Sequence, residues 1–170
     1  MDERRLGPRG PLVSEVGICP ADGPSRPAVV ERALALGCRL FWSSAPVPGA
    51  MTLPSLGGFG AVRYNLRDQK AAHAEIARLS KAGQGVVAVH VLGGGDLATP
   101  PPGLGSLAGP GRTFVQAAIQ FVLANEKVSC AVIRVSNPDH VEEVLRAPDA
   151  APLRGSELEL IFETWANRFD

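Results

Sequence analysis

The chain has 170 residues, of which 45% are hydrophobic and 20% charged, and its formal net charge at pH 7 is +0. This length and composition are typical of one globular domain, which we expect to span residues 1–170. The balanced charge provides no electrostatic basis for binding nucleic acid or an anionic membrane surface, so we expect neither as a partner.

The opening stretch, MDERRLGPRG, is charged and lacks the apolar core of a secretory signal. No apolar run approaches the roughly 20 residues that a membrane-spanning helix needs. The three cysteines, Cys19, Cys38 and Cys130, are widely spaced and stand among apolar neighbours. We interpret them as buried thiols in a reducing cytoplasm, the alternative being a disulfide or a metal site, because none has a second Cys or a His at zinc-binding spacing.

Strands and helices are predicted in alternating order along the chain. Strands are indicated by short apolar, β-branched runs and helices by apolar residues that recur on one face. The strands are expected at Val13–Cys19, Cys38–Ser44, Ala61–Leu66, Val86–Leu92 and Ser129–Val135. The helices are expected at Pro27–Leu36, Gln69–Ala82, Thr113–Asn125, from Pro138 to Leu145, and at Gly155–Phe169. This alternation predicts an α/β fold with a parallel sheet of about five strands, whose ligands bind at the carboxyl ends of the strands.

Two segments rich in Gly and Pro, 45–60 and 93–112, show no periodicity and are predicted to be loops. The second is either a lid over a ligand or a slack connector. It contains GLGSLAG, but no strand leads into this run and no capped helix follows it at the proper place. A dinucleotide-binding fingerprint is therefore not indicated, and the chain has no Gly-Lys-Ser/Thr of a Walker loop.

The stretch VSCAVIRVSNPDHVEEVL predicts a buried strand that turns directly into a helix. Ser136 and Asn137 offer side-chain oxygens to the free N–H groups of this helix, and such an N-terminus can hold an anion. Arg134 and Arg146 would add positive charge, whereas Asp139 brings negative charge to the same turn. Two interpretations therefore stand side by side, a phosphate site and a simple helix cap.

Several segments, in this order, resemble those of the aldo/keto reductases, which are (β/α)8 barrels that use NADP(H). LGPRGPLVSEVGIC resembles their N-terminal hairpin and first strand, and VERALALGCRLFWSSAPVPG their helix and strand that normally end in Phe-Asp-Thr-Ala-x-x-Tyr-Gly. AVRYNL, QGVVAVHVLGGGDL and AVIRVSNPDHVEEVL resemble the sixth strand, the seventh strand with its loop, and the eighth strand with the turn that binds the cofactor phosphate. The resemblance covers most of the chain and implies a truncated TIM barrel.

The chain departs from this family at the catalytic positions. Ser43 stands at the family's aspartate and Pro48 at its tyrosine, and Val89 stands where an aromatic side chain usually stacks on the nicotinamide. The segments for the third, fourth and fifth strands, which carry the family's catalytic lysine and histidine, are missing between Ala50 and Gly60. What remains of the family's site is a set of cofactor-binding residues, Arg134, Ser136 and Asn137, so the resemblance implies NADP(H) binding that is weak or absent.

Reduction of a carbonyl by hydride needs a proton donor beside the developing alkoxide. Tyr64, the only tyrosine, lies on a different strand, and His90 is the best substitute because it ends a strand where ligands bind. The alternative for His90 is a core histidine with a satisfied hydrogen bond. Asp96 in the glycine-rich loop is a candidate partner of His90, and His73 and His140 are interpreted as structural residues.

Two hypotheses about function follow, and whether the chain is an enzyme stays open. In the first, it is a nucleotide- or protein-binding module that is not competent for the usual NADP(H)-dependent reduction. In the second, it is an NADP(H)-dependent oxidoreductase or other enzyme with altered catalytic residues centred on His90. About five strands cannot close an eight-stranded barrel, so we expect exposed sheet edges at Cys38–Ser44 and Ala61–Leu66 that favour a homo-oligomer.

Overall fold

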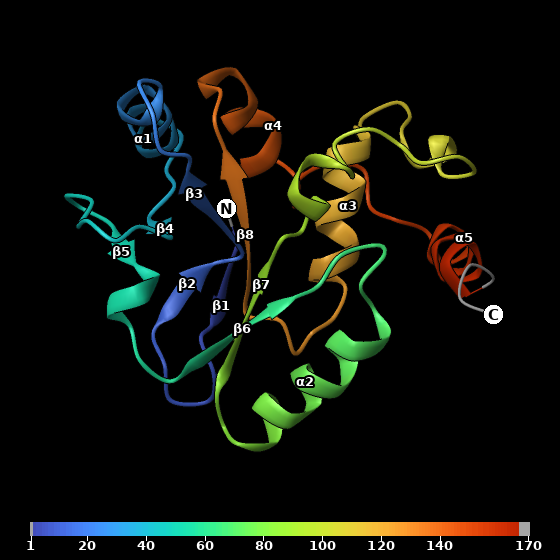
Figure 1. Cartoon of the computed structure of the whole chain (residues 1–170), viewed down its shortest axis with the longest axis horizontal. Helices are drawn as coiled ribbons and strands as arrows, with labels where there is room; N and C mark the ends of the chain where they lie inside the picture. Colours follow the sequence, from blue (N-terminus) through green and yellow to red (C-terminus); the bar gives the residue numbers. More distant parts are fainter. Residues whose placement is uncertain (1, 167–170) are drawn as a thin grey trace.

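The computed structural model describes residues 2–166, so the end of the helix predicted over Gly155–Phe169 lies outside the described residues. Its main sheet has six parallel strands in the order β5-β4-β3-β8-β7-β6 (Figure 1). These strands are β3 (Val16–Pro20), β4 (Leu40–Phe41), β5 (Met51–Thr52), β6 (Phe59–Arg63), β7 (Gly85–Val89) and β8 (Cys130–Val135). The prediction of a parallel α/β sheet is confirmed.

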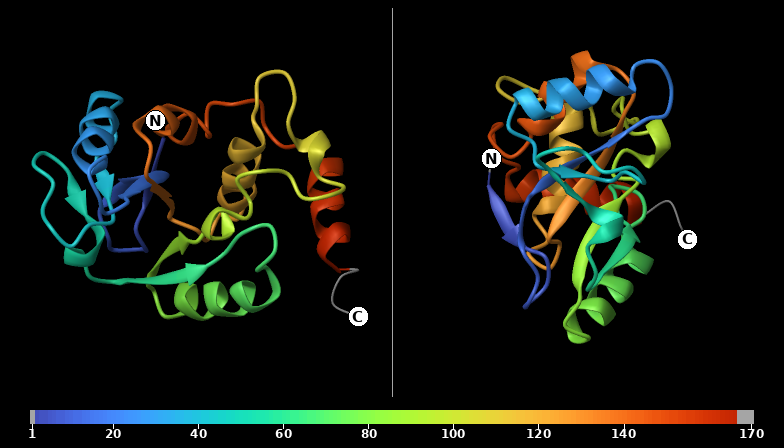
Figure 2. Two further views of the ribbon diagram at one scale, coloured as in Figure 1. Left: turned by 45° about the horizontal axis from the view of Figure 1, so that its top comes forward. Right: turned by 90° about the vertical axis from the view of Figure 1, so that its left-hand side faces the viewer.

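The α-helices come after β3, β6, β7 and β8 in the chain, and they follow one another around one face of the sheet (Figures 1 and 2). They are α1 (Arg26–Ala35), α2 (Lys70–Lys81), α3 (Phe114–Leu123), α4 (Val141–Leu145) and α5 (Gly155–Ala166). The best-capped is α3, where Thr113 and Gln116 bond each other's backbone N–H groups in a capping box. Within residues 2–166, no helix has both the length and the apolar surface needed to cross a membrane.

The strand order is that of a barrel from which part has been left out. The first strand, β3, pairs with the last, β8, over five residue pairs, and the remaining strands follow in sequence order on either side. The order breaks only between β5 and β6. The sheet nevertheless curls. This follows from the rings of Trp42, just after β4, and Phe59, in β6, which lie 6.2 Å apart although three strands separate β4 from β6. The fold is therefore a truncated, TIM-barrel-like sheet.

The strand count and one sheet edge differ from the prediction. Met51–Thr52 forms a sixth strand inside the segment 45–60 that was predicted to be a loop, and β6 begins at Phe59 rather than at Ala61. A two-residue strand has no periodicity to recognise, since it exists through its pairing with Leu40 and Phe41. Because β5 covers β4, the expected edge at Cys38–Ser44 is wrong, whereas β6 is an edge as predicted.

The central strands β3, β7 and β8 bury both faces. In β8, Ala131, Ile133 and Val135 contribute to the core beneath the helices, while Cys130 and Val132 contribute to a second core on the inner face of the curl. This alternation follows from the two-residue period of a strand. Because both faces are apolar, the strand sequence shows a continuous hydrophobic run instead of alternation.

A hairpin of β1 (Glu3–Arg5) and β2 (Leu12–Ser14) closes the amino-terminal end of the inner core with Leu6 and Val13. Its turn approaches the start of β7 so closely that a Cβ on Gly7 would lie 2.6 Å from the backbone nitrogen of Gly85. Gly7 also has a φ of 73°, so glycine is required there on both grounds. The hairpin therefore covers the amino-terminal end of the inner face, opposite the carboxyl ends of the strands.

Candidate functional site

A cavity of about 850 Å³ lies at the carboxyl ends of β3, β7 and β8. Its wall is mainly apolar and includes Trp42, Val89 and Val132. The polar and ionisable side chains on it are those of Cys19, His90, Arg134, Ser136, His140 and Glu143. A cavity of this size and character, at the carboxyl ends of parallel strands, is where ligands of α/β proteins bind.

Arg134 is the principal cation of this cavity. It stands on β8 directly opposite Cys19 of β3 in the parallel register. Its side chain is exposed, and its guanidinium has no hydrogen bond or ion pair with any of residues 2–166. Burial raises the pKa of the Cys19 thiol, while the positive charges of Arg134 and Arg26 oppose that rise. The cavity therefore contains a neutral thiol beside an arginine that is available to an anion.

Ser136 and Asn137 differ in whether their side chains are free to bind a ligand in the cavity. Ser136 is exposed, borders the cavity and makes no side-chain hydrogen bond within the described part of the chain. Asn137 does not border the cavity, and its Oδ1 accepts a hydrogen bond from the backbone N–H of Asp139 at 3.0 Å. Of the three residues that the resemblance assigns to the cofactor phosphate, Arg134 and Ser136 face the cavity and Asn137 caps the following turn.

The helix predicted from Pro138 is not one continuous α-helix. Pro138–His140 forms a 3-10 turn, η4, and the α-helix that follows, α4, has only five residues. Aligned peptide dipoles add up along a helix, so this short element contributes little positive potential to an anion. The positive charge at this turn therefore comes from the side chain of Arg134 rather than from a helix N-terminus.

His90 borders the cavity just beyond the end of β7, and its side chain is exposed. The interpretation as a core histidine is thus wrong. Its φ is 54°, and its carbonyl accepts hydrogen bonds from Asn65 Nδ2 at 3.0 Å and from the N–H of Gly93 at 2.8 Å. Asp96, the expected partner of the imidazole, instead pairs with Arg67 at 3.5 Å. The backbone is therefore held firmly, while the ring makes no hydrogen bond with residues 2–166.

Tyr64 lies away from the cavity. Its side chain is buried, and its hydroxyl lies 3.2 Å from Nε2 of His73 on α2. Burial raises the pKa of this phenol, although a hydrogen bond with the Asn125 side chain opposes the rise. None of the lysines, Lys70, Lys81 and Lys127, borders the cavity either. No tyrosine–lysine pair is therefore available to a ligand bound there.

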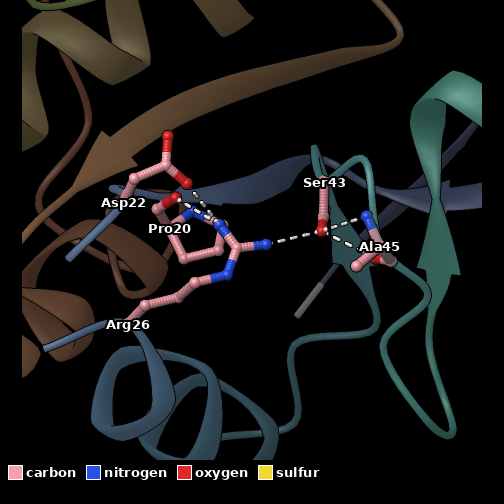
Figure 3. A network of polar contacts seen from close by, with 5 residues as sticks. All are labelled: Pro20, Asp22, Arg26, Ser43 and Ala45. Carbon is pink, nitrogen blue, oxygen red and sulfur yellow. Dashed lines mark hydrogen bonds and ion pairs between the residues drawn. The ribbon is translucent and has the colours of Figure 1, made fainter. Parts of the chain in front are cut away.

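The positions that the resemblance assigns to the family's aspartate and tyrosine also lie elsewhere. Figure 3 shows Arg26 reaching Ser43, with Nη2 donating to Ser43 Oγ at 2.8 Å. Nη1 of Arg26 donates to the carbonyl of Pro20 and to Asp22. Ser43 and Pro48 border a separate, shallower hollow of about 440 Å³ beside α1. The Ser43 hydroxyl is therefore committed to holding a loop and does not face the main cavity.

Three side chains on the cavity wall, His140, Glu143 and Trp42, were not predicted from the sequence. His140 was interpreted as structural, yet it is exposed and borders the cavity. His140 and Glu143 are three residues apart, which places them on the same side of the turn that follows β8, and this spacing was the available signal. Among residues 2–166 there is no group of His, Cys, Asp or Glu suited to a metal ion.

The glycine-rich segment 93–112 is anchored rather than slack. Its three leucines, Leu97, Leu104 and Leu107, are fully buried. Gly94 and Gly95, in its first turn, border the cavity. This segment therefore forms part of the cavity wall at one end and part of the core at the other.

These features define a class of protein: a truncated β/α barrel with a ligand-sized, largely apolar cavity at the carboxyl ends of its strands. Among solved structures, two of aldo-keto reductase AKR11C1 from Bacillus halodurans are similar to it, a holo form at 20% identity and an apo form at 19%. The TM-score is 0.49 in both cases, and the alignments cover 86% and 82% of this chain. The chain spans about half the length of that protein, 48% in each alignment. No protein-family model matches the chain, and no curated protein is significantly similar in sequence.

Proposed function

We propose that the chain is a binding module for a phosphate-bearing nucleotide, such as NADP(H), which it holds in the 850 Å³ cavity without carrying out the reduction typical of aldo/keto reductases. The observation that carries this proposal is the guanidinium of Arg134, exposed on the cavity wall and free of any ion pair with residues 2–166. Arginine binds phosphate through a planar set of donors, which suits this role.

The residues present fit a nucleotide in part. Arg134 and Ser136 would hold a phosphate, and the apolar wall that includes Trp42 and Val132 would cover a ring system. NADPH, when bound, supplies a hydride. The acidic side chain of Glu143 on the same wall weakens the attraction for an anion, and we therefore expect modest affinity.

The second half of the proposal, the lack of reductase activity, rests on proton delivery. A reductase must place an acid within hydrogen-bond reach of the carbonyl oxygen. Tyr64 is buried against His73, and no lysine borders the cavity. His90 and His140 are the two histidines on the wall, and an imidazole is the side chain that most often serves as a general acid.

The test is a titration of the whole chain with NADPH, followed by the change in NADPH fluorescence. Wild type should bind saturably, and Arg134→Ala should raise the Kd about 10-fold to 100-fold, the range expected for a lost charge-assisted hydrogen bond. Arg146→Ala is the matched control, because Arg146 is an exposed arginine close by in sequence that pairs with Glu142 and does not border the cavity. A flat titration of wild type would refute nucleotide binding and would leave the protein-binding form of the module.

A second function, an enzyme with altered chemistry, is favoured by the position of His90. Its ring is exposed on the cavity wall, where it could act as an acid or a base. The assay is the oxidation of NADPH in the presence of small aldehydes and ketones. We expect no turnover above background, whereas turnover that His90→Asn abolishes while NADPH still binds would establish the enzyme.

A further inference from the structure

We infer that His90 and His140 contact the anionic part of the ligand and make its binding depend on proton concentration. This inference rests on the function proposed above, because it concerns the same cavity. The two imidazoles come from the ends of neighbouring strands, His90 after β7 and His140 in the turn after β8. Both side chains are exposed, and both border the cavity with Arg134 and Ser136.

Neither imidazole ring makes an interaction within the fold that would explain why a histidine stands at that position. The ring of His90 and the ring of His140 make no hydrogen bond or ion pair with residues 2–166. His73 is the contrasting case, since its ring lies against Tyr64 and shares a polar contact with the phenol hydroxyl. Two of the three histidines of the chain therefore present unused ring nitrogens to the same cavity.

The charges of the other groups on the cavity wall offset one another, so the protonation of these imidazoles sets the net charge of the wall. Arg134 of β8 is positive, and Glu143 of α4, which has no side-chain partner among the described residues, is negative. The thiol of Cys19 on β3 stays neutral, because burial raises its pKa. Asp96 does not contribute to the wall, since it lies outside the cavity and pairs with Arg67.

The charges of Arg134 and Glu143 cancel when both imidazoles are neutral. Each imidazole that takes up a proton adds one positive charge and turns both of its nitrogens into donors. Imidazole is the side chain whose charge ordinarily changes between pH 5 and 8. An anion in the cavity is therefore held more tightly when either imidazole carries a proton.

The experiment measures the Kd of NADP+ by calorimetry at pH 8.0 and pH 5.5, for wild type, His140→Gln and His90→Asn. Asn is chosen at position 90 because it tolerates a positive φ. The ratio of variant Kd to wild-type Kd cancels the titration of the ligand's own phosphate. We expect this ratio to be close to one at pH 8.0 and roughly 3 to 5 at pH 5.5 for each variant, which is the scale of a solvent-exposed ion pair.

His73→Gln is the matched control, because His73 lies outside the cavity, and its ratio should be close to one at both pH values. Ratios for His90→Asn and His140→Gln that are the same at both pH values would overturn this inference and leave the proposed function standing. Absence of NADP+ binding by wild type at both pH values would overturn the proposed function and this inference with it. Thermal melts of all the variants check that each is folded.

Discussion

The rings of Trp42 and Phe59 meet edge to face with their centroids 6.2 Å apart. This contact joins the two arms of the open sheet, which are the side formed by β3, β4 and β5 and the side formed by β8, β7 and β6. Trp42 follows β4 and Phe59 lies in β6, and three strands, β3, β8 and β7, stand between them. A flat sheet would hold these rings far apart, at about 4.8 Å per strand. The contact therefore shows that the inner face is concave although part of a full barrel is missing.

This contact predicts an energetic coupling between the two arms. Trp42→Leu and Phe59→Leu each retain an apolar side chain, so the double-mutant cycle reports mainly the ring–ring interaction. We expect a coupling energy of about 0.5–1.5 kcal/mol in the free energy of unfolding measured with urea. A coupling indistinguishable from zero would mean that the arms do not meet in solution.

The three cysteines predict an order of thiol reactivity. Cys19 is half-buried on the cavity wall, whereas Cys38 and Cys130 are fully buried, and burial raises the pKa of Cys130 to about 12. Because the thiolate is the reacting species, a water-soluble disulfide reagent at pH 8 should modify Cys19 first. Cys19→Ser should remove the fast phase of the reaction, and all three thiols should react once the chain is unfolded. Modification of Cys130 as fast as Cys19 would contradict the structure.

The environment of Glu157 leads us to expect that the folded protein loses stability in acid. Burial would raise the pKa of this carboxyl, but hydrogen bonds from the backbone N–H of Arg154 and from the guanidinium of Arg112 outweigh it, so the pKa is lowered from its ordinary 4.5. A lowered pKa in the folded state stabilises the fold above the ordinary value, and this contribution is lost as the pH falls through the folded-state pKa.

The free energy of unfolding of Glu157→Gln should therefore lie below that of wild type at pH 7, and the difference should shrink as the pH falls from 5 to 3. The measurement is a series of urea denaturations across this pH range. Glu159→Gln is the control, because Glu159 is an exposed glutamate of the same helix with no ion pair among residues 2–166. A Glu157→Gln deficit that persists unchanged at pH 3 would rule out the carboxylate as its cause.

We propose that the free edge of β6 pairs with a second copy of the chain. The N–H of Tyr64 bonds to Val89 and the carbonyl of Gly58 accepts from Gly85, so the alternation of a parallel strand directs the N–H of Ala61 away from β7. An unpaired edge of this kind is a template for another strand. Light scattering at high concentration should therefore give a mass above the 17.8 kDa of one chain.

Ala61→Pro removes the outward N–H without removing a bond to β7, and it should return the mass to that of a single chain. Leu12→Ser is the control, since Leu12 is a large exposed apolar residue of the hairpin and is not part of the β6 edge. A wild-type mass of one chain at high concentration would refute the pairing, as would association that Leu12→Ser abolishes and Ala61→Pro does not.

The elements with a clear period or cap were predictable. The helix predicted over Gln69–Ala82 is found at Lys70–Lys81, and the strand predicted over Ser129–Val135 is found at Cys130–Val135. Both are recognised from local spacing, because one face of the helix and both faces of the strand are apolar. The short strand Met51–Thr52 was not predictable, since it exists only through its pairing with β4.

The residues of the candidate site likewise fall into those that were predictable from the sequence and those that were not. His90, Arg134 and Ser136 were predicted because each follows or ends an apolar strand, where parallel strands place ligands, and all three border the cavity. His140, Glu143 and Trp42 were missed, because the direction of a side chain in a short turn depends on the path of the backbone around it. Asn137 looks like a ligand residue in the sequence but is used as a cap.

By itself, the sequence determined the alternation of strands and helices and the strand ends at which polar residues gather, because apolar spacing and turn chemistry act over a few residues. Only the tertiary structure decided that Ser43 is tied to Arg26 while His140 faces Arg134's cavity, and that Tyr64 is buried beside His73. Which side chains share a cavity depends on how strands far apart in the chain pair and curl, and such long-range geometry leaves no trace in local spacing.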